Sequence, residues 1–162
     1  MLISDFKLWG WDKKTRTMLR FIKARDIFCF KLDEQRYCFG RIIIKFMVGH
    51  IAELFDNISN SPDISEAEIK QARRLIEPVI LDSYSLFDKK IEKGSDWRII
   101  GHQQNYVPTD MDGVYFTYGE EPWCKKVDIW GNKIPISEQE AESLPRVSPF
   151  GDYNIKELLK DI

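Results

Sequence analysis

The side chains with the greatest chemical potential are two histidines and three cysteines. These are His50 and His102 together with Cys29, Cys38 and Cys124. Imidazole and thiolate groups bind zinc and also serve as bases and nucleophiles in catalysis. However, no two of the five residues have the spacing of a metal-binding pair, and Cys29 and Cys38 lie within hydrophobic runs. The pattern therefore predicts buried, reduced thiols, with no metal centre and no disulfide framework.

Paired carboxylates are the next candidates for chemistry. Asp110 with Asp112 and Glu120 with Glu121 have the residue types of an acid–base pair. Because acidic residues are frequent in the polar segments of this chain, solvated charge is the favoured interpretation. The sequence also lacks glycine-rich phosphate loops, the HExxH metal motif and the GxSxG nucleophile motif. We therefore expect no enzyme activity, no cofactor and no small-molecule substrate.

The same carboxylates surround aromatic rings within residues 109–128, and this mixture suits the binding of a basic protein. Charge speeds the encounter of two proteins, and aromatic rings supply buried contact. The predicted partner-binding residues are Asp110, Asp112, Tyr118, Glu120, Glu121 and Trp123. In the alternative interpretation Tyr115 and Trp123 belong to the core and the acidic residues are ordinary turns. The sequence leaves both interpretations open.

The length and composition of the chain limit the fold that can position these residues. With 162 residues, 43% of them hydrophobic, the chain has the size and apolar content of one domain covering residues 1–162. No apolar run reaches the roughly 18 residues needed to cross a bilayer, and the N-terminus lacks the pattern of a secretion signal. We expect a cytoplasmic protein without a membrane partner.

Hydrophobic alternation in the first half of the chain predicts strands. Asp26–Leu32 and Arg36–Lys45 are rich in aromatic and β-branched residues, and the polar link between them predicts a β-hairpin. Phe46–Phe55 is predicted as a third strand, interrupted near Gly49. Further short strands are predicted at Val79–Leu81, Asp96–His102, Val114–Tyr118 and Lys126–Trp130.

Three short helices are predicted from capping signals and apolar spacing. Ser65 and Glu68 form a capping box, which predicts a helix that begins at Glu66 and ends near Ile76 or Glu77. A second capping box at Ser137 and a stripe of apolar residues from about Asp152 predict the other two. The expected fold class is α+β and mostly β: a curled antiparallel sheet or partly open barrel with about three short helices packed at its side.

Two separated segments resemble the immunity protein 26 family of bacterial polymorphic toxin systems. The first is Arg25–Leu32 followed by Arg36–Ile42, and the second is Trp97–His102. The resemblance implies a mostly β, non-catalytic protein that is encoded beside a secreted or contact-delivered toxin, as in contact-dependent growth inhibition. It also implies stoichiometric binding of that toxin in the cytosol. Our leading hypothesis is an immunity protein against a cognate toxin domain of the nuclease type.

The residues that carry this resemblance are interpreted as scaffold. They are Asp26, Phe28, Phe39, Gly40, Arg41, Trp97, Gly101 and His102. A glycine within a strand allows another segment or an aromatic ring to lie close, so Gly40 is expected at such a contact. Arg41 is expected to pair with a carboxylate such as Asp26 across the hairpin. His102 is expected to form a hydrogen bond at the end of its strand.

An alternative function uses the basic N-terminal segment, because cations and aromatic rings together can bind single-stranded nucleic acid. Its members are Lys7, Trp9, Trp11, Lys13, Lys14, Arg16, Arg20, Lys23 and Arg25. The first fifty residues are net basic, but the chain as a whole has a pI near 5.8. Nucleic-acid-binding domains are usually far more basic, so nucleic acid is not the expected partner.

Overall fold

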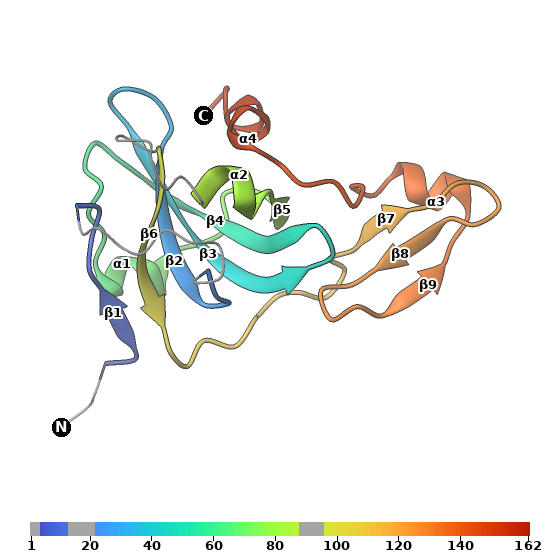
Figure 1. The fold of residues 1–162 in the computed structure, drawn as a ribbon, viewed down its shortest axis with the longest axis horizontal. Helices are drawn as coiled ribbons and strands as arrows, with labels where there is room; N and C mark the ends of the chain where they lie inside the picture. Colours follow the sequence, from blue (N-terminus) through green and yellow to red (C-terminus); the bar gives the residue numbers. More distant parts are fainter. Residues whose placement is uncertain (1–3, 13–21, 88–95) are drawn as a thin grey trace.

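The computed structural model describes residues 4–12, 22–87 and 96–162. In this part of the chain, nine strands form two antiparallel sheets and four short helices lie around them, without a closed barrel (Figure 1). The predicted mostly β, α+β class is therefore confirmed. Of the two predicted forms, the open, curled sheet is the one found.

The larger sheet has six strands in the order β1-β6-β2-β3-β4-β5. The strands are β1 (Phe6–Leu8), β2 (Asp26–Lys31), β3 (Tyr37–Phe46), β4 (Gly49–Ser59), β5 (Val79–Leu81) and β6 (Trp97–Gln103). The predicted hairpin is confirmed, since β2 pairs with β3 in antiparallel register. The pairing of β3 with β4 shifts register twice, near Gly40 and near Ile43. Such bulges bend a strand and increase its twist, which accounts for the curl of the sheet.

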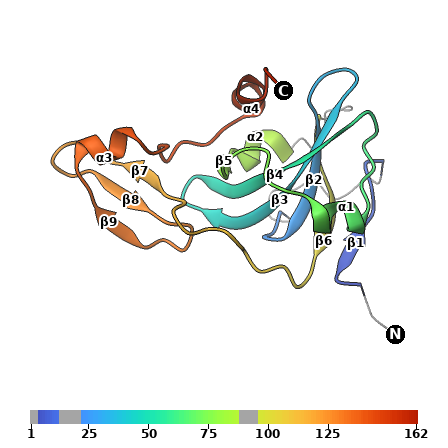
Figure 2. The ribbon, with the colours of Figure 1, turned by 180° about the vertical axis from the view of Figure 1, so that it is seen from behind.

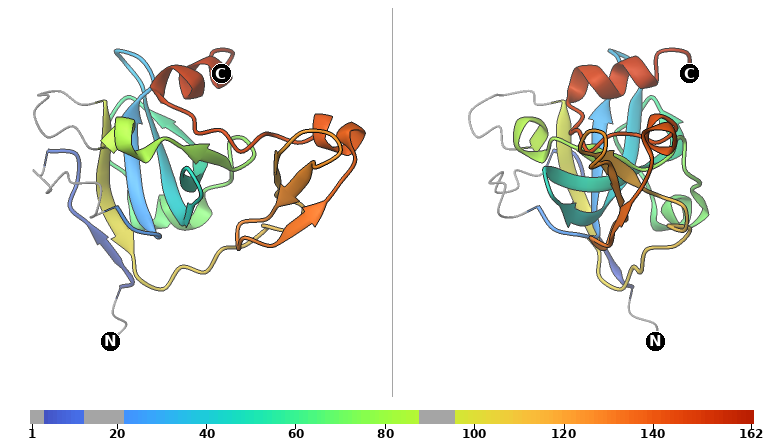
Figure 3. Two further views of the ribbon diagram at one scale, coloured as in Figure 1. Left: turned by 45° about the vertical axis from the view of Figure 1, so that its right-hand side comes forward. Right: turned by 90° about the vertical axis from the view of Figure 1, so that its right-hand side faces the viewer.

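The smaller sheet is made of β7 (Phe116–Tyr118), β8 (Lys125–Val127) and β9 (Lys133–Pro135), in that order. We call residues 112–147, which contain this sheet, the arm, and residues 104–111, which lead into it from β6, the connector. The arm extends from one end of the six-stranded sheet, and the chain returns from it to the last helix (Figures 1 and 3). Strands β7 and β8 were predicted from the sequence, whereas β9 was not.

Helix α1 (Glu66–Gln71) begins where its capping box predicts, with Ser65 accepting a hydrogen bond from the amide of Glu68. The predicted end near Ile76 or Glu77 is wrong, because the helix ends at Gln71. The chain beyond it instead runs beside β4: the amide of Leu75 donates to the carbonyl of Leu54, and that of Asp56 to the carbonyl of Arg73. These long-range bonds replace the further helical turn that the local sequence favours.

The remaining helices are α2 (Ser83–Phe87), α3 (Glu138–Glu142) and α4 (Asp152–Leu158). Both helices predicted in the last third of the chain are confirmed, whereas α2 was not expected. At the head of α3, Ser137 accepts a hydrogen bond from the amide of Glu140, as predicted. The side chain of Glu140 does not complete the capping box but forms an ion pair with Lys126 at 3.0 Å.

Three clusters of buried side chains hold the two sheets and the helices together. The first covers the face of the large sheet that α2 and α4 pack on, and the second covers the opposite face beneath α1, which Figure 2 shows from behind. The third cluster joins the arm to the large sheet: Ile43, Ile51 and Ile80 pack against Phe116 and Val127. Apolar contact thus anchors the part of the arm that lies nearest the six-stranded sheet.

Candidate partner-binding site

The structure divides the six predicted partner-binding residues between two places. Tyr118 ends β7, and Glu120, Glu121 and Trp123 follow it in the loop between β7 and β8. Asp110, in the connector, and Asp112, at the start of the arm, lie before β7, at the other end of that strand. The loop, residues 119–124, therefore holds three of the predicted residues directly after Tyr118, and the two aspartates lie apart from them.

The loop presents an indole to solvent. Trp123 is 75% exposed, so it is not part of the core, and both glutamates beside it are exposed as well. The main chain of the loop is closely packed: the amide of Trp123 donates to the carbonyl of Glu120. Gly119 has a positive φ of 85° and lies against the carbonyl of Trp123, where a side chain would collide. The main chain of the loop is thus closely packed, although the side chains of residues 120–123 are exposed.

Helix α3 adds carboxylates that were not predicted to belong to this surface. The amide of Ile136, just before the helix, donates to the carbonyl of Cys124 at 3.1 Å, which places the start of α3 beside the loop. Glu138 and Glu142 are exposed on this helix. The pairing of β8 with β9 brings them here, and β9 is the strand that the sequence failed to indicate.

Two lysines of the arm, Lys126 and Lys133, contact other groups. Besides its ion pair with Glu140, the ammonium of Lys126 lies 4.3 Å from the centre of the Tyr115 ring, and that of Lys133 lies 6.0 Å from the Tyr118 ring. Both rings are half-buried. The loop and α3 themselves carry five glutamates and no lysine or arginine, although Lys125 follows the loop directly.

A second exposed indole, Trp130, occupies the turn between β8 and β9 and is 58% exposed. The carboxylate of Asp128 accepts hydrogen bonds from the amides of Trp130 and Asn132 and from the side-chain amide of Asn132. Desolvation is the largest single influence on the pKa of Asp128 and acts to raise it, but the hydrogen bonds together outweigh it and lower that pKa. The turn lies at the opposite end of β8 from the Trp123 loop.

Among the motif residues, Arg41 pairs with a carboxylate as expected, but Asp26 is the wrong partner. Its guanidinium donates to Glu53 in the neighbouring strand β4 at 2.9 Å and to Gln103 in β6 at 2.8 Å. Arg41 and Glu53 are both buried, with exposed fractions of 6% and 7%. The register of β3 against β4 places the two residues opposite each other. The pair is therefore part of the interior of the protein.

Asp26 instead accepts a hydrogen bond from His102. The distance from Nδ1 of the ring to Oδ1 is 2.7 Å, and the amide of Lys23 donates to the other oxygen at 2.8 Å. Burial raises the pKa of the Asp26 carboxyl, although both of these donors act in the opposite direction. The expectation that His102 forms a hydrogen bond near the end of its strand is confirmed.

The other motif residues are packed in the interior. Phe28 and Phe39 are fully buried on opposite faces of the large sheet. A side chain at Gly40 would collide with the carbonyl of Glu53 and the ring of Phe28, and one at Gly101 would collide with the main chain of β1. The predicted close approach at Gly40 is confirmed.

Trp97 is central to an aromatic stack. Its ring lies parallel to that of Phe30 with 4.0 Å between centroids, and Phe28 and Phe87 pack around it. Its indole N–H donates to the carboxylate of Asp152 at 2.7 Å. The motif tryptophan thus holds the first residue of α4 against the six-stranded sheet.

The residues proposed for the nucleic-acid alternative are not arranged as a stacking surface. Trp11 is buried, with the Arg98 guanidinium 4.1 Å from its ring centre. Trp9 is half-buried and donates its indole N–H to the carbonyl of Ile99. Lys13, Lys14, Arg16 and Arg20 lie outside the described residues. The two rings that would stack on bases are therefore occupied by contacts within the protein.

All three cysteines are buried and free of disulfides. Burial raises the pKa of the Cys38 thiol to about 12 and also raises that of Cys29. Thiols with such high pKa values are poor nucleophiles and poor metal ligands at neutral pH. Within residues 4–12, 22–87 and 96–162, no group of three or more potential ligands is placed to hold a metal ion.

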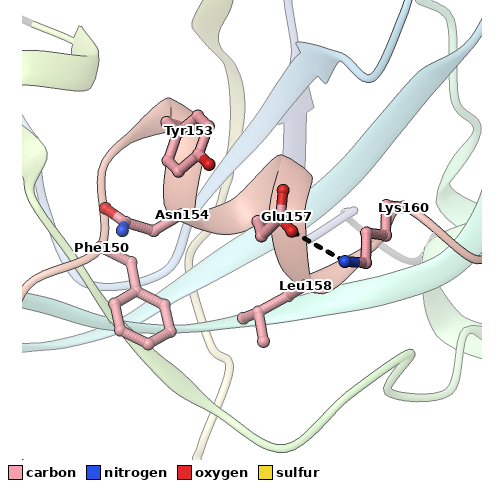
Figure 4. Close-up of a pocket in the computed structure, with 6 residues that line it drawn as sticks. All are labelled: Phe150, Tyr153, Asn154, Glu157, Leu158 and Lys160. Carbon is pink, nitrogen blue, oxygen red and sulfur yellow. Dashed lines mark hydrogen bonds and ion pairs between the residues drawn. The ribbon is translucent and has the colours of Figure 1, made fainter.

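A shallow depression of about 220 Å³ lies beside α4 (Figure 4). It is lined by Phe150, Tyr153, Asn154, Glu157, Leu158 and Lys160. None of the predicted site residues belongs to it. Across the part of the chain that the structure describes, no helix is long and apolar enough to span a bilayer.

His50 is a buried base that makes stability depend on pH. Its Nδ1 lies 2.6 Å from the hydroxyl of Ser83, and both side chains are buried. Burial, and to a smaller extent the charge of Lys45, lowers the pKa of His50. A lowered pKa in the folded state gives a contribution to stability that is complete above about pH 6.5 and is lost as the pH falls toward the folded-state pKa.

We therefore expect the free energy of unfolding to fall between pH 7.5 and 5.5, and to fall less in His50→Gln, whose amide keeps a polar partner for Ser83. Urea denaturation across this pH range measures the difference between the two proteins. The raised pKa of Asp26 acts with the opposite sign, so the comparison with the variant isolates His50. Equal pH dependence in both proteins would contradict this account.

Comparison with known proteins agrees with the motif residues. Searches of the curated proteins and of the solved structures found no match. A family model described as immunity protein 26 matches residues 25–128, which include the hairpin, the Trp97–His102 segment, the connector and the first two strands of the arm. This match covers well over half of the chain. The chain therefore belongs to the immunity protein 26 family.

Proposed function

We propose that this protein neutralises a cognate toxin domain by binding it in the cytosol through the loop between β7 and β8. The family supports the general role, because an immunity protein is a non-catalytic inhibitor whose partner is a protein toxin. The observation that carries the choice of surface is the 75% exposed indole of Trp123 in the same loop as the exposed Glu120 and Glu121. A large, exposed ring surrounded by charge is typical of an interface hot spot.

The charge of this surface favours a basic partner. Glu120 and Glu121 in the loop and Glu138 and Glu142 in α3 carry no ion pair among the described residues. Carboxylates placed in this way attract a cationic surface and increase the association rate. Many nucleases bind their substrate through a cationic cleft, since the substrate is a polyanion. We propose a nuclease-type toxin domain as the partner.

Two variants test the surface against the toxin domain encoded next to this chain. Trp123→Ala is expected to weaken binding about 30-fold or more, mainly through faster dissociation, because truncating a hot-spot residue costs at least about 2 kcal/mol. Reversing charge with Glu120→Lys and Glu121→Lys is expected to slow association and to reduce its dependence on salt. Surface plasmon resonance at two salt concentrations measures both rate constants.

Matched controls separate this surface from general effects. Trp130→Ala removes the other exposed indole of the arm, and the pair Glu34→Lys and Glu77→Lys reverses two exposed charges on other parts of the protein. Both controls are expected to bind the toxin domain as the wild-type protein does. Unchanged kinetics for both loop variants would show that the toxin binds elsewhere.

A further inference from the structure

The connector is held to the six-stranded sheet by a network of charged and polar groups. The ring of Tyr106 lies beneath the guanidinium of Arg41, 3.9 Å from its central carbon, and the Tyr106 hydroxyl donates to Glu53 at 3.3 Å. Burial, and next the charge of Glu53, raises the pKa of this hydroxyl, which therefore remains a donor. Arg25 donates to the carbonyl of Tyr106 at 2.8 Å. The amide of Gln104 also donates to the carbonyl of Asp5 at 2.7 Å, so the first half of the connector is held at two residues.

Arg74 fixes the second half of the connector. Its guanidinium donates to the carbonyls of Thr109 and Asp110, each at 2.7 Å. The same group forms an ion pair with Glu53 at 3.3 Å and contacts the sulfur of Met111 at 3.0 Å. One side chain therefore joins β4 to three successive residues at the point where the chain enters the arm.

The position of Arg74 is itself determined by the sheet. Its backbone forms a bridge with Phe55 of β4, and the residues on both sides of it make hydrogen bonds to the same strand. This is the stretch that leaves α1 early. Since the guanidinium is a planar fork with several donors, it can hold two carbonyls and a carboxylate in one geometry, which a lysine ammonium cannot reproduce.

The chain that returns from the arm is tied to β5 at Phe150, whose amide donates to the carbonyl of Ile80 at 2.7 Å. At the point where the chain enters the arm, the apolar cluster does not supply the control that Arg74 gives. Hydrophobic contact holds surfaces together but is not directional, whereas hydrogen bonds to two carbonyls fix angles as well as distances. We propose that Arg74 is a positioning residue that fixes the orientation of the arm relative to the six-stranded sheet, and so holds the Trp123 loop ready for its partner. The second half of this inference rests on the proposed function.

A distance measurement tests the orientation without any toxin. Spin labels are attached at Glu34→Cys and Gln139→Cys, which are exposed in the turn between β2 and β3 and on α3, while the native thiols are buried. The wild-type protein is expected to give one narrow distance distribution by electron–electron double resonance, and Arg74→Ala a broader or displaced one. Arg74→Lys is expected to give a distribution of intermediate width, because it keeps the positive charge but loses the planar guanidinium with its several donors.

The matched control is Arg73→Ala, which removes the same charge from the neighbouring, exposed residue. It is expected to leave the distances unchanged. Affinity for the adjacently encoded toxin domain is expected to fall about tenfold in Arg74→Ala and to be unchanged in Arg73→Ala, because an arm without fixed orientation must be ordered during binding. If Arg74→Ala does not fold, Arg74→Lys provides the same comparison.

The outcomes distinguish the two halves of the inference. A distance distribution that is equally narrow in Arg74→Ala overturns the assignment of orientation to this residue. A broadened distribution with unchanged toxin affinity overturns its role in presenting the loop. If the wild-type protein does not bind the toxin domain at all, the proposed function fails, and the distance measurement still decides what Arg74 does.

Discussion

Replacing Glu53 by alanine is expected to lower the free energy of unfolding by about 3–5 kcal/mol, the range found when one partner of a buried ion pair is removed. Glu53 is 7% exposed and is shared by two guanidinium groups and one hydroxyl. Its removal leaves the buried charge of Arg41 with only the amide oxygen of Gln103 as a hydrogen-bond acceptor among the described residues. Urea denaturation followed by circular dichroism measures the loss.

Two comparisons show whether the loss comes from an unpaired charge. The double variant Arg41→Met, Glu53→Leu removes both partners of the pair and is expected to be clearly more stable than Glu53→Ala alone, because no cation is then left at the Arg41 position. Glu34→Ala removes an exposed carboxylate and is expected to change stability by no more than about 0.5 kcal/mol. A Glu53→Ala protein as stable as Glu34→Ala would show that the pair contributes nothing.

Replacing Trp97 by alanine is expected to cost about 3–5 kcal/mol, the range for deleting a large buried ring. The ring is 2% exposed and stacks on Phe30, so its removal leaves a cavity in the first cluster. It also removes the hydrogen bond to Asp152. We therefore expect faster amide hydrogen exchange in α4 as well as a lower midpoint of thermal unfolding.

Trp97→Phe separates the two contributions of this residue. It keeps a ring in the stack but has no N–H for Asp152, so it is expected to cost about 1–2 kcal/mol and still to increase exchange in α4. Trp130→Ala, which deletes an exposed indole, serves as the control and is expected to be close to neutral. Equal losses for Trp97→Ala and Trp130→Ala would contradict the packing described above.

Local patterns in the sequence were sufficient to predict much of the fold. The β2–β3 hairpin follows from alternation, and the start of α1 follows from Ser65 and Glu68, because these signals depend only on neighbouring residues. The close contact at Gly40 could also be predicted, since a glycine inside a strand is typical of a place where another part of the chain approaches the backbone.

Features that depend on distant residues could not be predicted. Arg41 lies opposite Glu53 in a pairing of β3 with β4 whose register shifts twice, and such irregularities leave little trace in hydropathy. The early end of α1 has a similar cause. Hydrogen bonds from the amide of Asp56 to Arg73 and from the amide of Leu75 to Leu54 compete with a further helical turn. β9 was missed because its three residues are all exposed and lack any alternation.

The candidate surface was predicted only in part. Three residues of the loop lie close enough together in the sequence to be recognised as one group, namely Glu120, Glu121 and Trp123. Glu138 and Glu142 join them only through the pairing of β9 with β8, and Asp110 is separated from them by the length of β7. Which of these residues contact the toxin stays a prediction.

The outer strand of the arm sheet, β9, has a consequence for self-association. On the side that faces β8, the main-chain carbonyl of Asn132 accepts a hydrogen bond from the amide of Asp128, and the amide of Ile136 donates to the carbonyl of Cys124. Because hydrogen-bonding direction alternates along a strand, the main-chain groups of residues 133 and 135 point away from β8. Residue 135 is proline and has no N–H, and Lys133 adds a charge to the same short edge. Such an edge is a poor template for pairing with a strand of a neighbouring molecule. The arm, which exposes two tryptophans, is thereby protected from edge-to-edge aggregation.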